Sequence, residues 1–145
     1  MRDRVAVVSA NVDFVRSIFA AWERGDFLSS ADWAHPEIEF VYADGPAPGT
    51  WRGRAGMAKG FIDFVSAWED LRIGADEYRE LDAESILVLI HRSGRGKTSG
   101  LELAQTRSKG ALLFRVEDKV VTRLVIYWDR EFAFADLGLS AETDS

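Results

Sequence analysis

The stretch LVIYWDREFAFADLGL, residues 124–139, contains a predicted strand, a predicted helix and the point where one gives way to the other. Its first half alternates between two faces with the period of a β-strand. Leu124, Ile126 and Trp128 share one face. Because this face is wholly apolar, we expect it to pack against helices and to mark the inner side of a sheet.

Asp129 stands at the transition, directly after Trp128. The apolar residues that follow it recur at helical spacing: Phe132, Phe134 and Leu137. An aspartate before such a stripe is a favoured N-cap, which typically stabilises a helix by ~1 kcal/mol. Alternation also turns Asp129 away from the apolar face of the strand. We therefore interpret Asp129 as a helix cap in preference to a catalytic carboxylate.

The rest of the chain predicts helices followed by strands. Apolar residues recur at helical spacing over residues 12–22 and again over 57–68, which predicts two long helices. Alternating or continuous apolar segments predict strands at residues 38–42, 72–81, 86–91, 101–116 and 120–128. The expected fold class is α+β, a single domain over residues 1–145 with helices packed on one side of a curved, mostly antiparallel sheet.

The composition argues against several classes of function. The chain has 145 residues, 47% hydrophobic and 29% charged, which is typical of a globular domain. A net charge of −6 argues against a nucleic-acid partner, whose phosphates attract basic surfaces. There are no cysteines, and His35 and His91 lie far apart, so we expect no metal site and no cofactor. No apolar run approaches the ~18 residues of a membrane helix, so we expect a cytoplasmic protein without a membrane partner.

The sheet face opposite Trp128 has the composition of a subunit interface. It combines arginines with apolar and aromatic residues: Arg107, Leu113, Arg115, Arg123, Val125 and Tyr127. Arginine and aromatic residues are enriched where subunits meet. We therefore predict a homodimer through this outer face, with a solvated basic surface as the alternative. A monomeric mass by light scattering at micromolar concentration would contradict the dimer.

Several segments resemble the SnoaL-like group of the nuclear transport factor 2 superfamily, in order and over nearly the whole chain. They are NVDFVRSIFAAWERGDF (residues 11–27), HPEIEFVY (35–42), GTWRGRAGM (49–57), AWEDLRI (67–73) and FRVEDKVVTRLVIYWDREFAFADLGL (114–139). The resemblance implies a helix-lined cone with a strongly bent sheet and a deep, mostly apolar cavity. The superfamily includes ketosteroid isomerases, polyketide cyclases, limonene epoxide hydrolases, scytalone dehydratases and many proteins without an assigned activity, so the fold does not give the function.

The catalytic positions of the isomerases are not kept in this chain. The resemblance places their general base at Tyr42, their carbonyl-polarising acid near Leu112 and their oxyanion-hole tyrosine near Ile18. Ketosteroid isomerase chemistry depends on an aspartate base and on a protonated acid beside a tyrosine. That particular activity is therefore not expected.

The epoxide hydrolases are the better comparison. Their water-holding tyrosine and asparagine correspond to Tyr42 and Asp44, whereas their other polar groups fall in the apolar segment ILVLI (residues 86–90) and at Ile126. A carboxylate beside an inward-pointing phenol in an apolar pocket can act as a base. Tyr42 and Asp44 are therefore the candidate catalytic pair. The alternatives are a core tyrosine bonded locally and a turn aspartate in ADGP.

His91 ends the predicted strand 86–91, and an imidazole there could act as an acid or a base near neutral pH. No carboxylate partner is visible in the sequence. We therefore interpret His91 as a structural strand-end residue.

Residues and resemblance together predict a domain that binds a small, largely apolar molecule in its cone, without a metal or cofactor. The expected ligand-lining residues are Ile18, Trp22, Phe40, Ser108, Leu112, Ile126 and Trp128. One alternative is a cofactor-free isomerase, polyketide cyclase or epoxide hydrolase-like enzyme. The other is a non-enzymatic dimeric interaction module whose cavity is filled by its own side chains.

Overall fold

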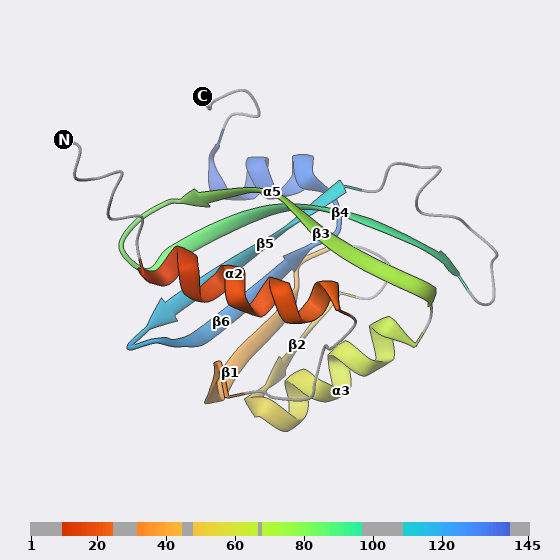
Figure 1. Ribbon diagram of the computed structural model, residues 1–145, viewed down its shortest axis with the longest axis horizontal. Helices are drawn as coiled ribbons and strands as arrows, with labels where there is room; N and C mark the ends of the chain where they lie inside the picture. The colour runs from red at the N-terminus through yellow and green to blue at the C-terminus, as the bar shows by residue number, and fades with distance from the viewer. Residues whose placement is uncertain (1–9, 25–31, 45–47, 67, 97–108, 140–145) are drawn as a thin grey trace.

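The computed structural model describes residues 10–24, 32–44, 48–66, 68–96 and 109–139 (Figure 1). Within these residues the chain forms three helices and six strands. In chain order they are α2 (Ala10–Glu23), β1 (Ala34–Tyr42), β2 (Gly49–Arg52), α3 (Gly53–Val65), β3 (Trp68–Glu80), β4 (Ser85–Gly96), β5 (Lys109–Glu117), β6 (Val120–Tyr127) and α5 (Arg130–Leu137). None of the helices in this described part is long and apolar enough to cross a membrane.

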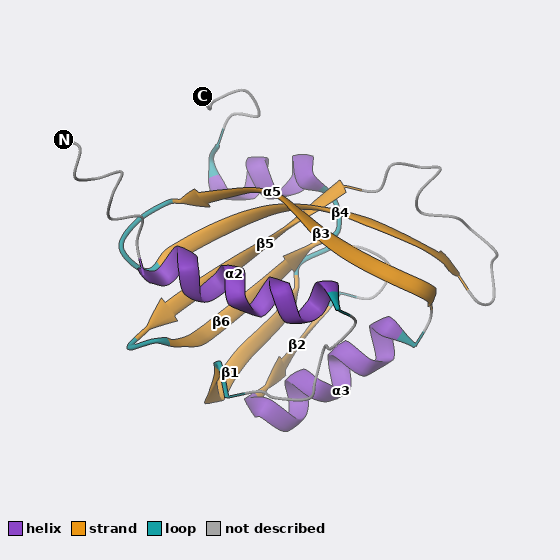
Figure 2. Cartoon of the chain, in the orientation of Figure 1, coloured by secondary structure: helices purple, strands orange, loops and turns teal. Residues whose placement is uncertain are grey.

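The strands form one curved, open sheet in the order β2-β1-β6-β5-β4-β3 (Figure 2). Neighbours are antiparallel, except that β1 and β6 run parallel. Helices α2 and α3 pack on one face of this sheet, which we call the inner face, and α5 packs on the other, outer face (Figure 1). The predicted α+β fold, with helices on a curved, mostly antiparallel sheet, is confirmed. The expectation that the helices all pack on one side is wrong, because α5 packs on the outer face.

The inner face carries the main apolar core. Helical spacing turns one side of α2 toward the sheet, with Val12, Val15, Ile18, Phe19 and Trp22 buried. The strands contribute alternate residues to the same core, among them Phe40 from β1, Val88 from β4 and Leu124 from β6. Such burial of apolar surface is the main force that holds helices on a sheet.

The outer face is more buried than the sequence predicted. Val125 and Tyr127, expected on an exposed face, are only 3% and 2% exposed. Helix α5 turns back across this end of the sheet and places Ala133 and Phe134 against them. The Tyr127 hydroxyl also donates to Asp136 Oδ2 over 2.8 Å. The prediction that Val125 and Tyr127 lie on an exposed interface is therefore wrong, because α5 covers them within one chain.

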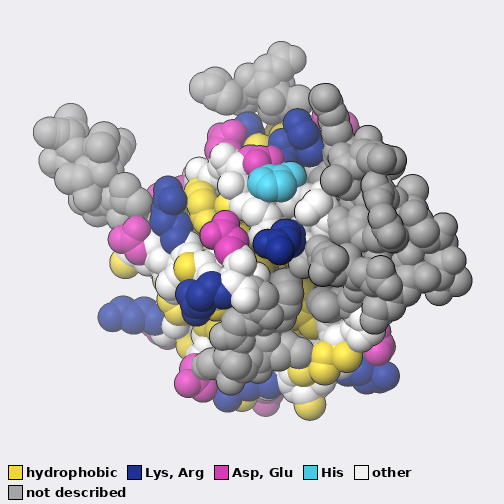
Figure 3. All heavy atoms as spheres, turned by 45° about the vertical axis from the view of Figure 1, so that its right-hand side comes forward, with side chains coloured by type: hydrophobic (Ala, Val, Ile, Leu, Met, Phe, Trp, Pro, Cys, Tyr) yellow, Lys and Arg dark blue, Asp and Glu magenta, His cyan; other side chains and the backbone are white. Residues whose placement is uncertain are grey.

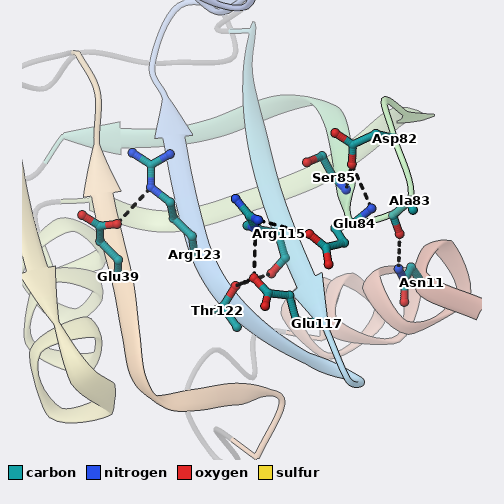
Figure 4. Close-up of polar contacts among 10 residues, drawn as sticks. All are labelled: Asn11, Glu39, Asp82, Ala83, Glu84, Ser85, Arg115, Glu117, Thr122 and Arg123. Atoms are coloured by element: carbon teal, nitrogen blue, oxygen red, sulfur yellow. Dashed lines mark hydrogen bonds and ion pairs between the residues drawn. The ribbon is translucent and has the colours of Figure 1, made fainter.

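What α5 leaves open on the outer face is a strip of paired charges (Figure 4). Arg123 Nε lies 3.1 Å from Glu39 Oε1. Arg115 contacts Glu117 over 2.9 Å and Glu84 over 3.1 Å. Exposed pairs of this kind contribute roughly 0–1 kcal/mol each. Arg107 lies outside the described residues, and the homodimer through this face stays a prediction.

Asp129 is the N-cap of α5, as predicted. Its backbone is extended, at φ −111° and ψ 122°, and its side chain accepts a hydrogen bond from Glu131 N over 3.2 Å. Gly138 ends the helix in the left-handed conformation, at φ 71°. There the Leu139 amide donates to the Phe134 carbonyl over 2.8 Å. Glycine suits this position because a side chain strains the left-handed backbone.

Several element boundaries differ from the sequence prediction: β1 begins at Ala34 and not at residue 38, and β4 continues to Gly96 and not only to residue 91. Trp68 begins β3, so the second helix ends at Val65 and does not continue to residue 68. The segment Gly49–Arg52 forms the short strand β2, which pairs with the end of β1. Four residues that follow a Gly- and Pro-rich loop show too little alternation to be recognised as a strand.

Candidate functional site

Tyr42 ends β1 on the inner face, at the end of the sheet where α5 begins. Its hydroxyl donates to the Gly60 carbonyl of α3 over 3.4 Å. Burial raises the pKa of Tyr42 above its ordinary value, and the nearby Asp63 carboxylate raises it further. The phenol therefore stays protonated at neutral pH, where it donates a hydrogen bond and is a weaker acid than an ordinary tyrosine.

Five of the predicted ligand-lining residues belong to the inner-face core: Ile18, Trp22, Phe40, Leu112 and Ile126. Ile126 lies beside Tyr42 in the pairing of β6 with β1. The Phe40 and Tyr42 rings are 5.2 Å apart. Trp128 follows β6 at the same end and is partly exposed, whereas Ser108 lies outside the described residues.

Asp44 lies two residues beyond β1 and joins the ends of distant elements. Its Oδ1 accepts a hydrogen bond from Trp128 N over 2.7 Å. Its Oδ2 accepts another from Asp129 N over 3.2 Å. The structure thus brings Tyr42, Asp44 and Trp128 to the same end of the sheet. In this arrangement the Asp44 carboxylate holds the junction between β6 and α5, and its catalytic role stays a prediction.

Arg92 is a site residue that the sequence reasoning missed. It is only 3% exposed, and among the described residues it is the only charged one that is buried. Its guanidinium donates to the Trp128 carbonyl and lies 4.3 Å from the centre of the Trp128 ring. Burial lowers the pKa of Arg92 to about 10, so the side chain is still a cation at neutral pH. The signal was in the sequence, because alternation from Val88 and Ile90 puts Arg92 on the inner face.

On the outer side of the same end, Asp76 joins three elements. Its Oδ1 lies 2.7 Å from His91 Nδ1, and its Oδ2 accepts from Arg130 over 2.8 Å. Arg130 also donates to the Ile90 carbonyl over 2.7 Å. Acidic, basic and histidine side chains lie close together on the face shown in Figure 3. His91 therefore has the carboxylate partner that the sequence did not reveal.

The pairing of β3 with β4 explains the contact between His91 and Asp76. Gly74 lies opposite His91 in this pairing. A Cβ on Gly74 would lie 2.6 Å from His91 Cε1, closer than atoms can approach. The imidazole therefore crosses over Gly74 to reach Asp76, and the glycine is needed for that close approach.

Asp76→Asn is expected to lower the free energy of unfolding at pH 7 by roughly 0.5–1 kcal/mol, since solvent screens a partly exposed carboxylate. Burial acts to raise the pKa of Asp76, but hydrogen bonds from Arg130 and His91 and their charges bring it below its ordinary value. A lowered folded pKa stabilises the protein above the unfolded pKa of ~3.9, and this contribution is lost as the pH falls through the folded value.

Urea unfolding of Asp76→Asn at pH 7 and near pH 3 tests this expectation. The difference from the unchanged protein should be clear at pH 7 and small at the lower pH. Asp63→Asn is the matched control, because Asp63 is 63% exposed and lies 3.6 Å from Lys59. A difference that does not depend on pH would contradict the assigned role of the Asp76 carboxylate.

The comparisons with known proteins agree with this architecture, which is that of an α+β domain with helices over a curved sheet. The family model described as "SnoaL-like domain" matches residues 15–124. The chain belongs to this family. No curated protein sequence matches the chain.

Solved structures with the same fold include three that cover most of the chain. One is TerC co-crystallised with polyporic acid, at a TM-score of 0.70 and 20% identity, covering 89% of this chain and 98% of TerC. A second is an NTF2-like protein of unknown function from Burkholderia pseudomallei. Its TM-score is 0.70 and its sequence identity 22%, and the match covers 88% of this chain and 97% of that one. A third, from Catenulispora acidiphila, has a ketosteroid isomerase-like fold and was solved in complex with trimethylamine. Its TM-score is 0.64 and its sequence identity 15%, and the match covers 91% of this chain and 97% of that one. At these identities the likeness shows the fold alone.

Proposed function

We propose that this SnoaL-like domain binds a small, largely apolar molecule between the inner face of its sheet and helices α2 and α3. The observation that carries the proposal is a change of chemistry along the inner face. The face is apolar through Leu124 and Ile126, and at the end of the sheet it meets the Tyr42 hydroxyl, the Arg92 guanidinium and the Trp128 ring. Ligand sites are commonly apolar, with a few convergent polar groups that fix the orientation of the ligand.

The structural neighbours support a small organic ligand. TerC was crystallised with polyporic acid, and the Catenulispora protein was solved with trimethylamine. Because both are distant in sequence, neither compound is proposed for this chain. They support only the general kind of molecule that a fold of this type holds.

A cofactor-free isomerase, polyketide cyclase or epoxide hydrolase-like activity is the second proposal, and Tyr42 and Asp44 would carry it. A phenol that stays protonated at neutral pH suits a hydrogen-bond donor to a substrate oxygen. Each carboxylate oxygen of Asp44 has more than one lone pair, so it can accept from a main-chain amide and still take a substrate proton. Asp44 would then act as the base while it holds Trp128 in place.

Thermal shift against small hydrophobic ketones, epoxides, lactones and aromatic polyketide-like compounds tests the binding proposal. A ligand at 100 times its Kd stabilises the folded protein by ~2.7 kcal/mol, which raises Tm by several degrees. Trp128→Ala should abolish this shift. Phe132→Ala should keep it, because Phe132 is 41% exposed on α5, on the outer side of the sheet.

The outcomes separate binding from catalysis. Binding with turnover that is lost in Asp44→Asn supports the enzyme proposal. Binding without turnover of any compound leaves the domain as a binding protein. A shift that persists in Trp128→Ala contradicts the proposed position of the site, and a panel without any shift contradicts the binding proposal.

A further inference from the structure

Arg92 places a positive charge on an otherwise apolar face. On β4, the inner-face residues before it are Ile86, Val88 and Ile90, which are all fully or almost fully buried. Arg92 continues this alternation and is itself 3% exposed. Leaving water is costly for a cation, so a buried arginine needs specific compensation from its surroundings.

The surroundings of Arg92 fix its guanidinium in one orientation. The group donates to the Trp128 carbonyl, and its central carbon lies 4.3 Å from the centre of the Trp128 ring. Gly110 of β5 leaves room for the guanidinium, since a Cβ at this position would lie 2.5 Å from the Arg92 Nη1 atom. A guanidinium held in this way is preorganised, so less conformational entropy is lost when it binds a further group.

The charge of Arg92 persists at neutral pH. Burial lowers the pKa of the guanidinium, and the nearby Arg130 cation lowers it further, whereas the Asp44 and Asp129 carboxylates raise it. These two carboxylates also accept hydrogen bonds from the main chain, Asp44 from Trp128 N and Asp129 N, and Asp129 from Glu131 N. The two carboxylates therefore hold the junction between β6 and α5 and also offset part of the positive charge of Arg92. An anionic group on a bound molecule would compensate the buried cation further.

We propose that Arg92 is the recognition group for an acidic ligand, binding a carboxylate or the ionised hydroxyl of an enol or phenol on an otherwise apolar molecule. This inference rests on the proposed binding function and narrows its ligand class. The planar fork of a guanidinium matches a carboxylate with two parallel hydrogen bonds. Tyr42 lies at the same end of the inner face, where its hydroxyl donates to the Gly60 carbonyl and would exchange that bond for one to a second oxygen of the ligand.

Matched pairs of an acid and its neutral amide test the proposal directly. We would measure the Kd of 2-naphthoate and 2-naphthamide, and of biphenyl-4-carboxylate and its amide, by calorimetry at pH 7. Each pair has nearly the same shape and differs in charge. The acid is expected to bind at least tenfold more tightly than the amide. Arg92→Met should remove that preference, and Arg92→Lys should keep part of it.

Arg115→Met is the control for net charge. Arg115 lies on the outer face, where it pairs with Glu84 and Glu117, so its loss changes the total charge equally and leaves the inner face unchanged. The acid-to-amide ratio should be the same in this variant as in the unchanged protein. A ratio that falls equally in Arg115→Met and Arg92→Met would overturn the assignment to Arg92.

The unchanged protein provides a second test, which holds even when Arg92→Met does not fold. Acid and amide of equal affinity would overturn acid recognition and leave the proposed function standing. Binding of neutral ketones or epoxides alone would have the same consequence. Absence of binding by every compound would contradict the proposed function as well. In an NMR spectrum of the arginine Nε–H groups, the acid should shift the signal that is missing from Arg92→Lys, and an unmoved signal contradicts direct contact.

Discussion

Trp22→Ala is expected to lower the free energy of unfolding by about 3–5 kcal/mol, as for other large aromatic residues removed from a core. Trp22 is 2% exposed, and its ring lies 5.0 Å from Phe19 and 5.3 Å from Phe61. It also contacts Trp33 and Phe114, with ring centres 6.1 Å and 6.2 Å away. The substitution would leave a space between α2, α3 and the sheet that these rings cannot fill. Urea unfolding followed by circular dichroism measures the loss.

Phe132→Ala is the matched control for the loss of an aromatic side chain. Phe132 is 41% exposed on α5, and its ring lies 6.1 Å from Tyr127. We expect a loss below about 1 kcal/mol, as for surface substitutions in general. Equal losses in the two variants would contradict the central place of Trp22 in the core.

Asp44→Ala is expected to lower the free energy of unfolding by about 2–3 kcal/mol, because it removes a charged acceptor from two main-chain donors. Those donors are Trp128 N, 2.7 Å from Oδ1, and Asp129 N, 3.2 Å from Oδ2. Asp44→Asn retains one carbonyl acceptor, so its loss should be about half as large. Urea unfolding of both variants, with Asp63→Ala as the exposed control, measures the difference.

The two Asp44 variants also separate a structural role from a catalytic one. If the carboxylate only holds the junction of β6 and α5, ligand affinity and any turnover should follow stability, with Asn milder than Ala. If Asp44 is also a base, turnover should be lost equally in both variants, since neither side chain can take a proton. Full stability in Asp44→Ala would contradict the junction role itself.

The fold was predictable because its signals are local. Apolar spacing in α2 and alternation in β6 each appear within a short window, and the cap at Asp129 is a one-residue signal with a known geometry. The covering of Val125 and Tyr127 was not predictable in the same way. It depends on the direction in which α5 leaves the sheet, and a helical stripe does not specify that direction.

The candidate site depends on contacts between residues that are distant in sequence. Asp44 and Trp128 meet because β1 and β6 are neighbours, and Asp76 reaches His91 because β3 pairs with β4 at Gly74. No single-sequence pattern encodes such a register. Arg92 is different, since its inward position follows from simple alternation along β4. Composition alone does not mark it as buried, because arginine side chains are mostly exposed in folded proteins.

The parallel pairing of β1 with β6 has a consequence for how the protein is made. Ala34 lies opposite Val121 and Tyr42 opposite Ile126, so a strand from the first third of the chain needs a neighbour from the last sixth. During synthesis at roughly 5–20 residues per second, β1 leaves the ribosome several seconds before β6 exists. Throughout that interval one edge of β1 and the apolar rings behind it have no neighbour from β6. Nascent chains of this domain should therefore depend on chaperone protection until the last strand emerges.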